Sequence, residues 1–269
     1  MRGMRNFSLV LGTLFVSILF VIMLVSLFYT PHPPNEMNVR ERLQAPSARH
    51  LLGTDNFGRD VFSRVMVGAQ TAFQVGAVSV AIGLAGGFLI GTLAGYAGRW
   101  VDELLMRATD ALLAFPGILL ALLLVSVTKP SLFQTMLAIG ILSIPSFARV
   151  IRAGVLQQKE ADYVKAARGL GAGYANLIFV QIMPNIASAI VTTAALNFST
   201  AILIEAALSY LGLGVQPPDP SWGRMLNEAQ SYLAKSPWFA LAPGVLITLS
   251  VLGFNLLGDG IRDLRDNSI

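Results

Sequence analysis

Glu205 is a carboxylate in the interior of a long apolar stretch, and it is the first residue of this sequence that could do chemistry. No Lys or Arg lies within one helical turn of it. An ionisable side chain in such surroundings is costly and marks a candidate functional site. Three roles stay open for Glu205: a neutral, hydrogen-bonded packing residue, a gate contact, or a ligand for the cationic terminus of a solute.

Arg107 and Asp110 are a second pair of charged residues at the start of an apolar stretch. They are three residues apart, so they can pair on one face of a helix, and we interpret them as a structural ion pair rather than as solute ligands. Pro116 and Pro145 interrupt apolar stretches, where proline removes a backbone hydrogen bond and favours a kink. A hinge role for these prolines is the less favoured interpretation.

Several common catalytic and cofactor sites are excluded by the residues that are missing. No lysine follows a glycine, as a Walker P-loop requires, so we expect no ATP to bind this chain through that motif. The chain has no cysteine, which excludes disulfides and thiolate-bound metals. His32 and His50 have no partner at metal-ligand spacing. We therefore predict that the chain is not an enzyme and holds neither a metal nor a cofactor.

The elements that carry these residues belong to a membrane protein. The chain is 54% hydrophobic and only 13% charged, whereas a soluble domain carries roughly a quarter charged residues. Its basic pI of about 9.6 does not indicate nucleic-acid binding, because the basic residues occupy short gaps between apolar stretches. A lipid bilayer is the solvent that such a surface requires.

Six apolar segments are long enough to cross about 30 Å of hydrocarbon at about 1.5 Å per helical residue. They are approximately Phe7–Tyr29, Thr71–Tyr96, Leu104–Thr128, Leu132–Ala148, Ile186–Leu213 and Phe239–Leu257. The first is too long for a typical signal peptide and lacks a small-residue cleavage site, so it is read as a retained membrane helix. The sequence thus predicts an all-α membrane protein, with residues 1–68 forming a first helix plus an external loop, and residues 69–269 a five-helix core.

Basic residues are distributed unequally between the two sides of this predicted topology. Eleven Lys and Arg residues lie on the side that holds both termini and the long gap 149–184, and eight lie on the other side. The positive-inside rule therefore places both termini and this gap in the cytoplasm.

Glycines in the second segment recur at four-residue spacing at Gly83, Gly87, Gly91 and Gly95. Such small residues let helix backbones approach closely in lipid. The favoured interpretation is packing within the chain, and a subunit interface is the alternative.

The segment from Glu160 to Pro184 is the most informative polar stretch. Tyr163, Ala166, Ala167 and Leu170 share one face of a predicted helix, and Lys165 and Arg168 lie on the other. Gly169, Gly171 and Gly173 then permit a sharp turn before a second short helix. Two short helices joined by a glycine turn would form a compact projection that a cytosolic partner could bind.

This segment resembles the EAA loop of ABC importer permeases, in which Glu-Ala-Ala is followed by three residues, Gly, nine residues and Ile-x-Leu-Pro. The spacing from Ala166-Ala167 to Gly171 and Pro184 is kept. Lys165, Gln181 and Met183 replace the Glu, Ile and Leu of the pattern.

Other blocks resemble the peptide/nickel branch of that family, in particular its dipeptide and oligopeptide permeases of the C type. They are Leu52-Gly53-Thr54-Asp55 through Gly58–Arg64, Asp110 to Phe115-Pro116, Leu208–Pro218 with Ser221-Trp222-Gly223, and Phe254–Asp259. Because these independent blocks occur in the right order, the resemblance covers nearly the whole chain from about Leu52.

The resemblance implies a type I importer in a bacterial or archaeal inner membrane. Two permease subunits, forming a heterodimer, would pair in the bilayer, two ATPase subunits would bind ATP and Mg²⁺ and dock on the EAA loops, and an external binding protein would deliver the solute. The implied ATPase-coupling residues are Glu160, Tyr163, Lys165, Ala166, Ala167, Arg168, Gly171 and Pro184. The translocation or gate candidates are Glu205, Asp110 and Pro116, and the external docking candidates are Asp55, Arg59, Asp60, Arg64 and Trp222.

For the four charged docking candidates, a solvated and self-paired loop helix is the favoured interpretation, and docking or a plug over the channel is the alternative. Peptide is the first choice of solute and nickel or a nickel chelate the second. An ion-coupled secondary transporter or a channel would instead work without ATP and without partner proteins.

Overall fold

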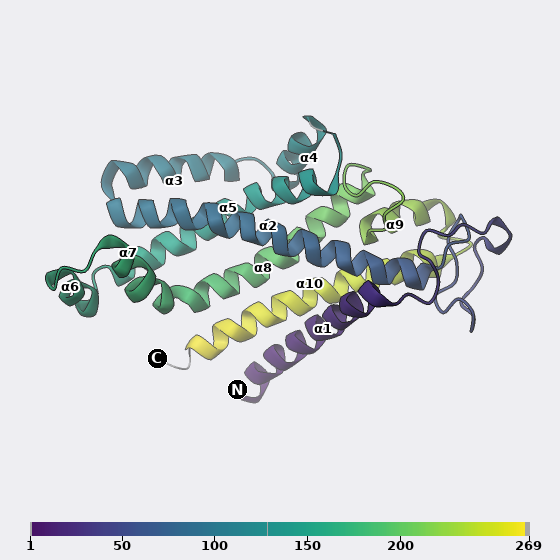
Figure 1. Ribbon diagram of the computed structural model, residues 1–269, viewed down its shortest axis with the longest axis horizontal. Helices are drawn as coiled ribbons and strands as arrows, with labels where there is room; N and C mark the ends of the chain where they lie inside the picture. The colour runs from purple at the N-terminus through teal and green to yellow at the C-terminus, as the bar shows by residue number, and fades with distance from the viewer. Residues whose placement is uncertain (1, 128, 267–269) are drawn as a thin grey trace.

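The computed structural model describes residues 2–127 and 129–266, and the regular secondary structure of this part of the chain consists of helices, joined by loops (Figure 1). Its only extended pairing among the described residues is one isolated bridge between Thr54 and Asp60. The long helices are α1 (Arg2–Phe28), α2 (Val61–Ala97), α3 (Arg99–Leu113), α4 (Gly117–Val127), α5 (Leu132–Gln158), α8 (Met183–Tyr210) and α10 (Pro237–Asp266). The short elements are η1 (Val39–Glu41), α6 (Asp162–Gly169), α7 (Tyr174–Asn176), the π-helical segment η2 (Leu177–Ile182), α9 (Trp222–Ala229) and η3 (Gln230–Tyr232).

Five helices are long and apolar enough to span a membrane, and a bent pair makes a sixth candidate. The predicted all-α fold is thus confirmed. The spans are only 11–44% buried within the chain, because the rest of their apolar surface is left for lipid or for another subunit.

The third predicted span is wrong as a single straight helix. The chain forms α3, breaks at residues 114–116, and continues as α4 at an angle of 85°. Pro116 has no backbone N–H to continue α3, and its carbonyl instead accepts bonds from the N–H groups of Leu119 and Leu120 at the start of α4. Thr128, the predicted end of this span, lies outside the described residues.

The helix pair α2 and α5 is the most extensively packed in the structure. Glycines of α2 face α5 closely: a Cβ added at Gly91 would lie 2.6 Å from the carbonyl oxygen of Ala148, and one at Gly83 would lie 2.5 Å from the Cβ of Ser143. Backbones this close leave no room for a methyl group. The interpretation of the four glycines as packing residues within the chain is therefore confirmed.

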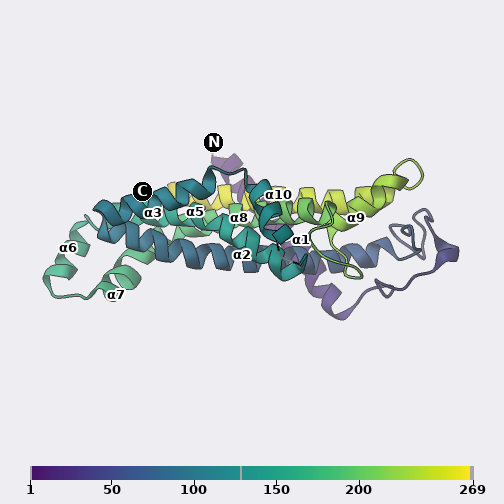
Figure 2. The ribbon, with the colours of Figure 1, turned by 90° about the horizontal axis from the view of Figure 1, so that it is seen from above.

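The remaining spans complete an elongated bundle. Helix α10 packs between α1 and α8, and α8 also contacts α2 and α5. In both views α6 and α7 lie at one end of the bundle, and the loop between α1 and α2 lies with α9 at the other (Figures 1 and 2). The start of α1 and the end of α10 point toward the α6 end (Figure 1).

We call the far end the loop cap: residues 30–60 together with α9. Val61 and Val65 from the start of α2 pack there against Met225, Ala229 and Phe239, and all five are at most 3% exposed. The loop cap thus has its own apolar core, which holds the connecting loop against the bundle.

Candidate functional site

The projection between α5 and α8 folds as two short helices joined by a glycine turn. Helix α6 ends in a Schellman motif: the N–H of Gly171 donates to the carbonyl of Arg168, and that of Ala172 to the carbonyl of Ala167, both at 3.0 Å. Gly171 has φ +86°, a conformation that only glycine adopts without strain. The predicted helix–turn–helix is confirmed.

The base of this projection is anchored in the bundle. Val164, Leu177 and Ile182 are at most 1% exposed and pack with residues of α5, and Ala167 packs against the same cluster. The inward face of α6 therefore carries Ala167 of the predicted face together with Val164, which was not predicted there. Leu170, predicted on the same helix face as Ala167, is 90% exposed.

Tyr163 ties the projection to both neighbouring helices. Its hydroxyl donates to the side-chain carbonyl of Gln158 at 2.5 Å and accepts from the amide of Asn185 at 3.1 Å. Because Gln158 ends α5 and Asn185 begins α8, this hydroxyl connects the two helices that carry the projection.

The outer face of the projection is open. The remaining coupling candidates Glu160, Lys165, Ala166, Arg168, Gly171 and Pro184 are all exposed. Glu160 and Lys165 form an ion pair at 3.3 Å, with both side chains more than half exposed, so the pair contributes little to stability. The apolar side chains of Leu170 and Tyr174 are also exposed at the tip. A rigid base with an exposed tip of mixed apolar and basic character is a geometry suited to gripping a partner.

Glu205 is buried in α8, where it is 1% exposed. The hydroxyl of Ser209, one turn on, donates to its Oε1 at 2.6 Å, and the same hydroxyl oxygen accepts from the N–H of Val215 at 3.0 Å. This arrangement fits the first of its three roles, a hydrogen-bonded packing residue that holds the chain leaving α8. The gate and solute roles stay predictions.

Arg107 and Asp110 do not pair with each other, so that interpretation is wrong. Arg107 binds Glu103, one turn away on α3, at 2.7 Å, and Asp110 binds Arg149 of α5 at 2.6 Å. The i,i+4 geometry favours the first pair, and the packing of α3 on α5 supplies the second. Asp110 is a surface residue in this chain, with a side chain 59% exposed.

A second cross-helix pair was missed by the sequence reading. Arg152 of α5 makes a bidentate contact with Asp102 of α3, with Nη2 at 2.5 Å from Oδ2. The two pairs together fasten α3 along α5, and Pro116 lies at the bend that follows. Nothing in the local spacing of either residue indicates a partner on a different helix.

The external docking candidates are buried in the loop cap. Asp55, Arg59, Asp60, Arg64 and Trp222 are all at most 4% exposed. The interpretation of the four charged residues as a solvated helix is therefore wrong, although Asp55 does pair with Arg59 and Arg64, whereas Asp60 pairs with His50. These side chains offer no exposed surface to a binding protein themselves. Docking of the binding protein therefore stays a prediction for the loop that they hold together.

Four charged residues, Asp55, Arg59, Arg64 and Glu228, form one network in the interior of this end of the bundle. The carboxylate of Asp55 accepts from Arg59 Nε at 2.5 Å, Arg59 Nη2 donates to Glu228 of α9 at 2.6 Å, and Arg64 donates to the carbonyl of Pro34 at 3.2 Å. Trp222, also from α9, donates its indole N–H to the carbonyl of Val65 at 3.0 Å. The role of Glu228 could not be predicted from the sequence, because its partner Arg59 is 169 residues away.

Comparison with known proteins gives consistent matches. The pattern of the family described as "Binding-protein-dependent transport system inner membrane component" matches residues 87–269. The chain is 42% identical to the dipeptide transport system permease protein DppC of Alkalihalophilus pseudofirmus, over 97% of this chain and 86% of the relative. It is 43% identical to the di/tripeptide transport system permease protein DppC of Pseudomonas aeruginosa, over 95% of this chain and 86% of the relative.

A third relative and a solved structure extend the comparison. The glutathione transport system permease protein GsiD of Pectobacterium atrosepticum is 41% identical over 98% of this chain and 88% of its own length. An inward-facing structure of the MetNI methionine ABC transporter is similar with a TM-score of 0.59, at 17% identity, over 77% of this chain and 95% of the other. That likeness concerns the fold.

Proposed function

The chain belongs to the family of binding-protein-dependent transport system inner membrane components, and on that premise we propose that it carries di- or oligopeptides across the membrane. It is a multi-pass inner-membrane permease subunit of an ABC importer. The named substrates of the relatives above are dipeptides, di- and tripeptides, and glutathione, which supports a short peptide as the solute. Nickel or a nickel chelate is the alternative solute within the same family.

Coupling to ATP hydrolysis is proposed to run through residues 159–184. The observation that carries this proposal is the contrast between the buried base of the projection and its exposed tip, with Val164 0% and Leu170 90% exposed. A partner that pulled on the tip would move α5 and α8 together, because the base is packed into both helices. Of the translocation candidates, Glu205 lies on α8, and Asp110 of α3 is bound to Arg149 of α5.

The assembly that this implies contains a second permease subunit in a heterodimer, two ATPase subunits and an external binding protein. The ATPases would bind ATP and Mg²⁺, and this chain would bind neither. The α6 end of the bundle, with both termini, would face the cytoplasm, and the loop cap would face the binding protein. The sequence supports this orientation through its excess of Lys and Arg on the α6 side.

The test is solute uptake into proteoliposomes that contain the chain with its co-purifying partners. Labelled dipeptides and Ni²⁺ are offered with and without ATP and the binding protein. Peptide uptake that requires both ATP and the binding protein supports the proposal. Uptake of Ni²⁺ but not of peptide would make nickel the solute. Uptake by this chain alone, driven by an ion gradient or running downhill, would overturn the coupling proposal in favour of a secondary transporter or channel.

A matched pair of glycine variants tests the coupling projection itself. Gly171→Ala places a Cβ at φ +86°, which costs about 1–2 kcal/mol in the left-handed region and opens the turn. Gly169→Ala is the control, because Gly169 has ordinary helical backbone and no atom within 4 Å of an added Cβ. ATP-driven uptake should fall about tenfold in the first variant and stay near the wild-type rate in the second. Equal rates would contradict a role for the turn in coupling.

A further inference from the structure

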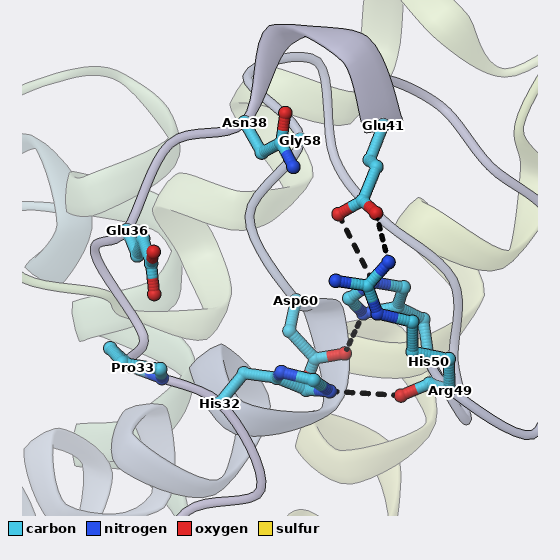
Figure 3. Close-up of a pocket in the computed structure, with 9 residues that line it drawn as sticks. All are labelled: His32, Pro33, Glu36, Asn38, Glu41, Arg49, His50, Gly58 and Asp60. Carbon is cyan, nitrogen blue, oxygen red and sulfur yellow. Dashed lines mark hydrogen bonds and ion pairs between the residues drawn. The ribbon is translucent and has the colours of Figure 1, made fainter.

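Two histidines that are far apart in the sequence meet inside the loop cap (Figure 3). His32 follows the end of α1, His50 lies in the middle of the loop, and Asp60 is the N-cap residue of α2. The two imidazole rings lie against each other at a tilt of 32°, with centroids 4.6 Å apart. A cavity of about 70 Å³ lies beside them, and it is also lined by Glu36, Glu41 and Arg49.

Three of these side chains offer ligand atoms that converge. One atom each from His32, His50 and Asp60 lie within 4.8 Å of one another. Two ligands of a tetrahedral ion, each about 2.0–2.1 Å from it, are about 3.3 Å apart. Small side-chain rotations would therefore bring all three onto one ion, without movement of the backbone elements that carry them.

His50 is the side chain that points to a cation. It is flanked by carboxylates on both sides: Nδ1 lies 2.8 Å from Oδ1 of Asp60, and Nε2 lies 3.6 Å from Oε2 of Glu41. The side chain is 5% exposed, and Nε2 has no hydrogen-bond partner among the described residues. A neutral imidazole can donate from only one nitrogen, so the lone pair of the other nitrogen would face a carboxylate. A positive charge beside His50 removes that conflict.

A metal ion satisfies the cluster better than a protonated imidazole. The His32 ring lies against the His50 ring at a tilt of 32°, so a metal ion beside them can take a lone pair from each imidazole, whereas a proton is held by one of them. The carbonyl of Arg49 accepts from Nε2 of His32 at 2.9 Å. Since a carbonyl only accepts, this contact fixes the tautomer of a neutral His32 and leaves Nδ1 with its lone pair.

The surroundings already supply the supporting contacts that a metal site needs. The backbone N–H and the hydroxyl of Ser63 donate to Oδ2 of Asp60 at 2.7 and 2.8 Å, which orients that carboxylate. Glu41, held by Arg49, faces the second nitrogen of His50 in the manner of the carboxylates that commonly orient metal-bound histidines. With neutral imidazoles, the carboxylates of Asp60, Glu41 and Glu36 outnumber the single cation Arg49 around the cavity.

We propose that His32, His50 and Asp60 bind one divalent transition-metal ion, of the Zn²⁺ or Ni²⁺ class, and that this ion fastens the loop cap to the start of α2. Two imidazoles and one carboxylate suit such ions, whereas Mg²⁺ and Ca²⁺ prefer oxygen ligands throughout. The spacing of the two histidines in the sequence gives no sign of this cluster, because folding brings its ligands together from both ends and the middle of the loop.

The test is metal binding by the full-length chain in detergent, purified through a tag without histidine and stripped with a chelator. Calorimetric titration with ZnCl₂ and NiSO₄ and a metal assay after dialysis should give one ion per chain. His32→Asn and His50→Asn should each weaken binding by more than about 100-fold. Asp219→Asn is the control, an exposed carboxylate of the loop between α8 and α9, and should bind as the wild type does.

The outcomes separate the proposal from its alternatives. The chain has no cysteine and no other histidine, so binding that survives the double variant H32N/H50N would be adventitious carboxylate binding and would overturn the site. No binding by the wild type would also overturn it. Each variant must elute and give circular dichroism like the wild type. If H50N does not fold, the metal affinity of H32N decides instead, because His32 is only half-buried and its replacement disturbs the fold less.

Limited proteolysis tests the role of the ion. Arg49 lies in the loop, and its side chain is 67% exposed, so trypsin can cleave after it. Zn²⁺ should slow this cleavage at least tenfold in the wild type and leave H32N unaffected. Stoichiometric binding without slower cleavage would overturn the fastening role.

Discussion

The substitution Asp55→Asn should open the loop cap, because it removes a charge from a network that water cannot reach. Asp55 is fully buried, and its carboxylate faces Arg59 Nε at 2.5 Å and Arg64 Nε at 3.7 Å. In the variant, the amide oxygen can keep the bonds from the backbone N–H groups of Phe57 and Arg59, and the amide NH₂ then faces guanidinium groups, which only donate. Among the residues that the structure describes, Glu228, at 2.6 Å from Arg59 and 3.9 Å from Arg64, is then the one carboxylate left in an ion pair with these two buried cations.

The expected magnitude follows from this burial. Breaking one buried ion pair while leaving its partner in place costs about 3–5 kcal/mol. At about 1.4 kcal/mol per tenfold, the population of opened loop cap should rise by roughly two to four powers of ten. The matched control is Glu103→Gln, which breaks the pair with Arg107 where both side chains are more than 60% exposed. In this control the population of opened loop cap should change by less than about threefold.

A single buried cysteine can report the opening, since the chain has no native cysteine. Ala229→Cys places a thiol in the apolar core of the loop cap, where Ala229 is 0% exposed, and all variants are made in that background. Alkylation by a maleimide should be about a hundredfold faster or more with Asp55→Asn, because its rate follows the population of the opened state. Glu228→Gln, at 11% exposed, is the second variant if Asp55→Asn does not fold. Alkylation rates that rise equally with Asp55→Asn and Glu103→Gln would refute the reasoning.

Three further outcomes are expected. Ser209→Ala should lower stability by about 1–3 kcal/mol in a detergent unfolding assay, because it leaves Glu205 and a backbone N–H buried without this hydroxyl. Glu205→Gln should leave peptide uptake unchanged, since the new amide can still accept from Ser209; a lost uptake with normal folding would instead support the solute role. Gly91→Ala should lower stability by about 1–3 kcal/mol through its clash with α5. The control Gly244→Ala, with no atom within 4 Å of the added Cβ, should leave stability unchanged. Equal thermal midpoints for the two variants would count against close packing of α2 on α5.

Features that depend on neighbouring residues could be predicted from the sequence. The apolar length of Phe7–Phe28 and of Leu132–Gln158 is enough to identify a membrane span. The four-residue spacing of glycines in α2 predicted close helix packing, and the glycines around Gly171 predicted the turn in the coupling projection. Each of these signals is a property of a few consecutive turns of one helix.

The bend at Pro116 shows where local signals stop. The apolar run from residue 104 onward has the length of a span, and the proline within it indicated only a kink. Asp102 and Asp110 hold α3 along α5 through their arginine partners. The chain therefore does not continue straight after α3 but turns by 85° into α4. A hydropathy pattern carries no information on such pairs, because their members are 39 and 50 residues apart.

Tertiary structure alone decided the roles of the charged residues. Asp55 and Arg59 form a locally predictable pair, but their burial depends on Glu228, which α9 brings from 169 residues away. His32 and His50 had no partner in the sequence, and the folding of the loop onto the N-cap of α2 placed them beside Asp60. The physical reason is the same in each case. Chain connectivity fixes which residues share a helix face, whereas the burial and pairing of a charge depend on which elements pack around it.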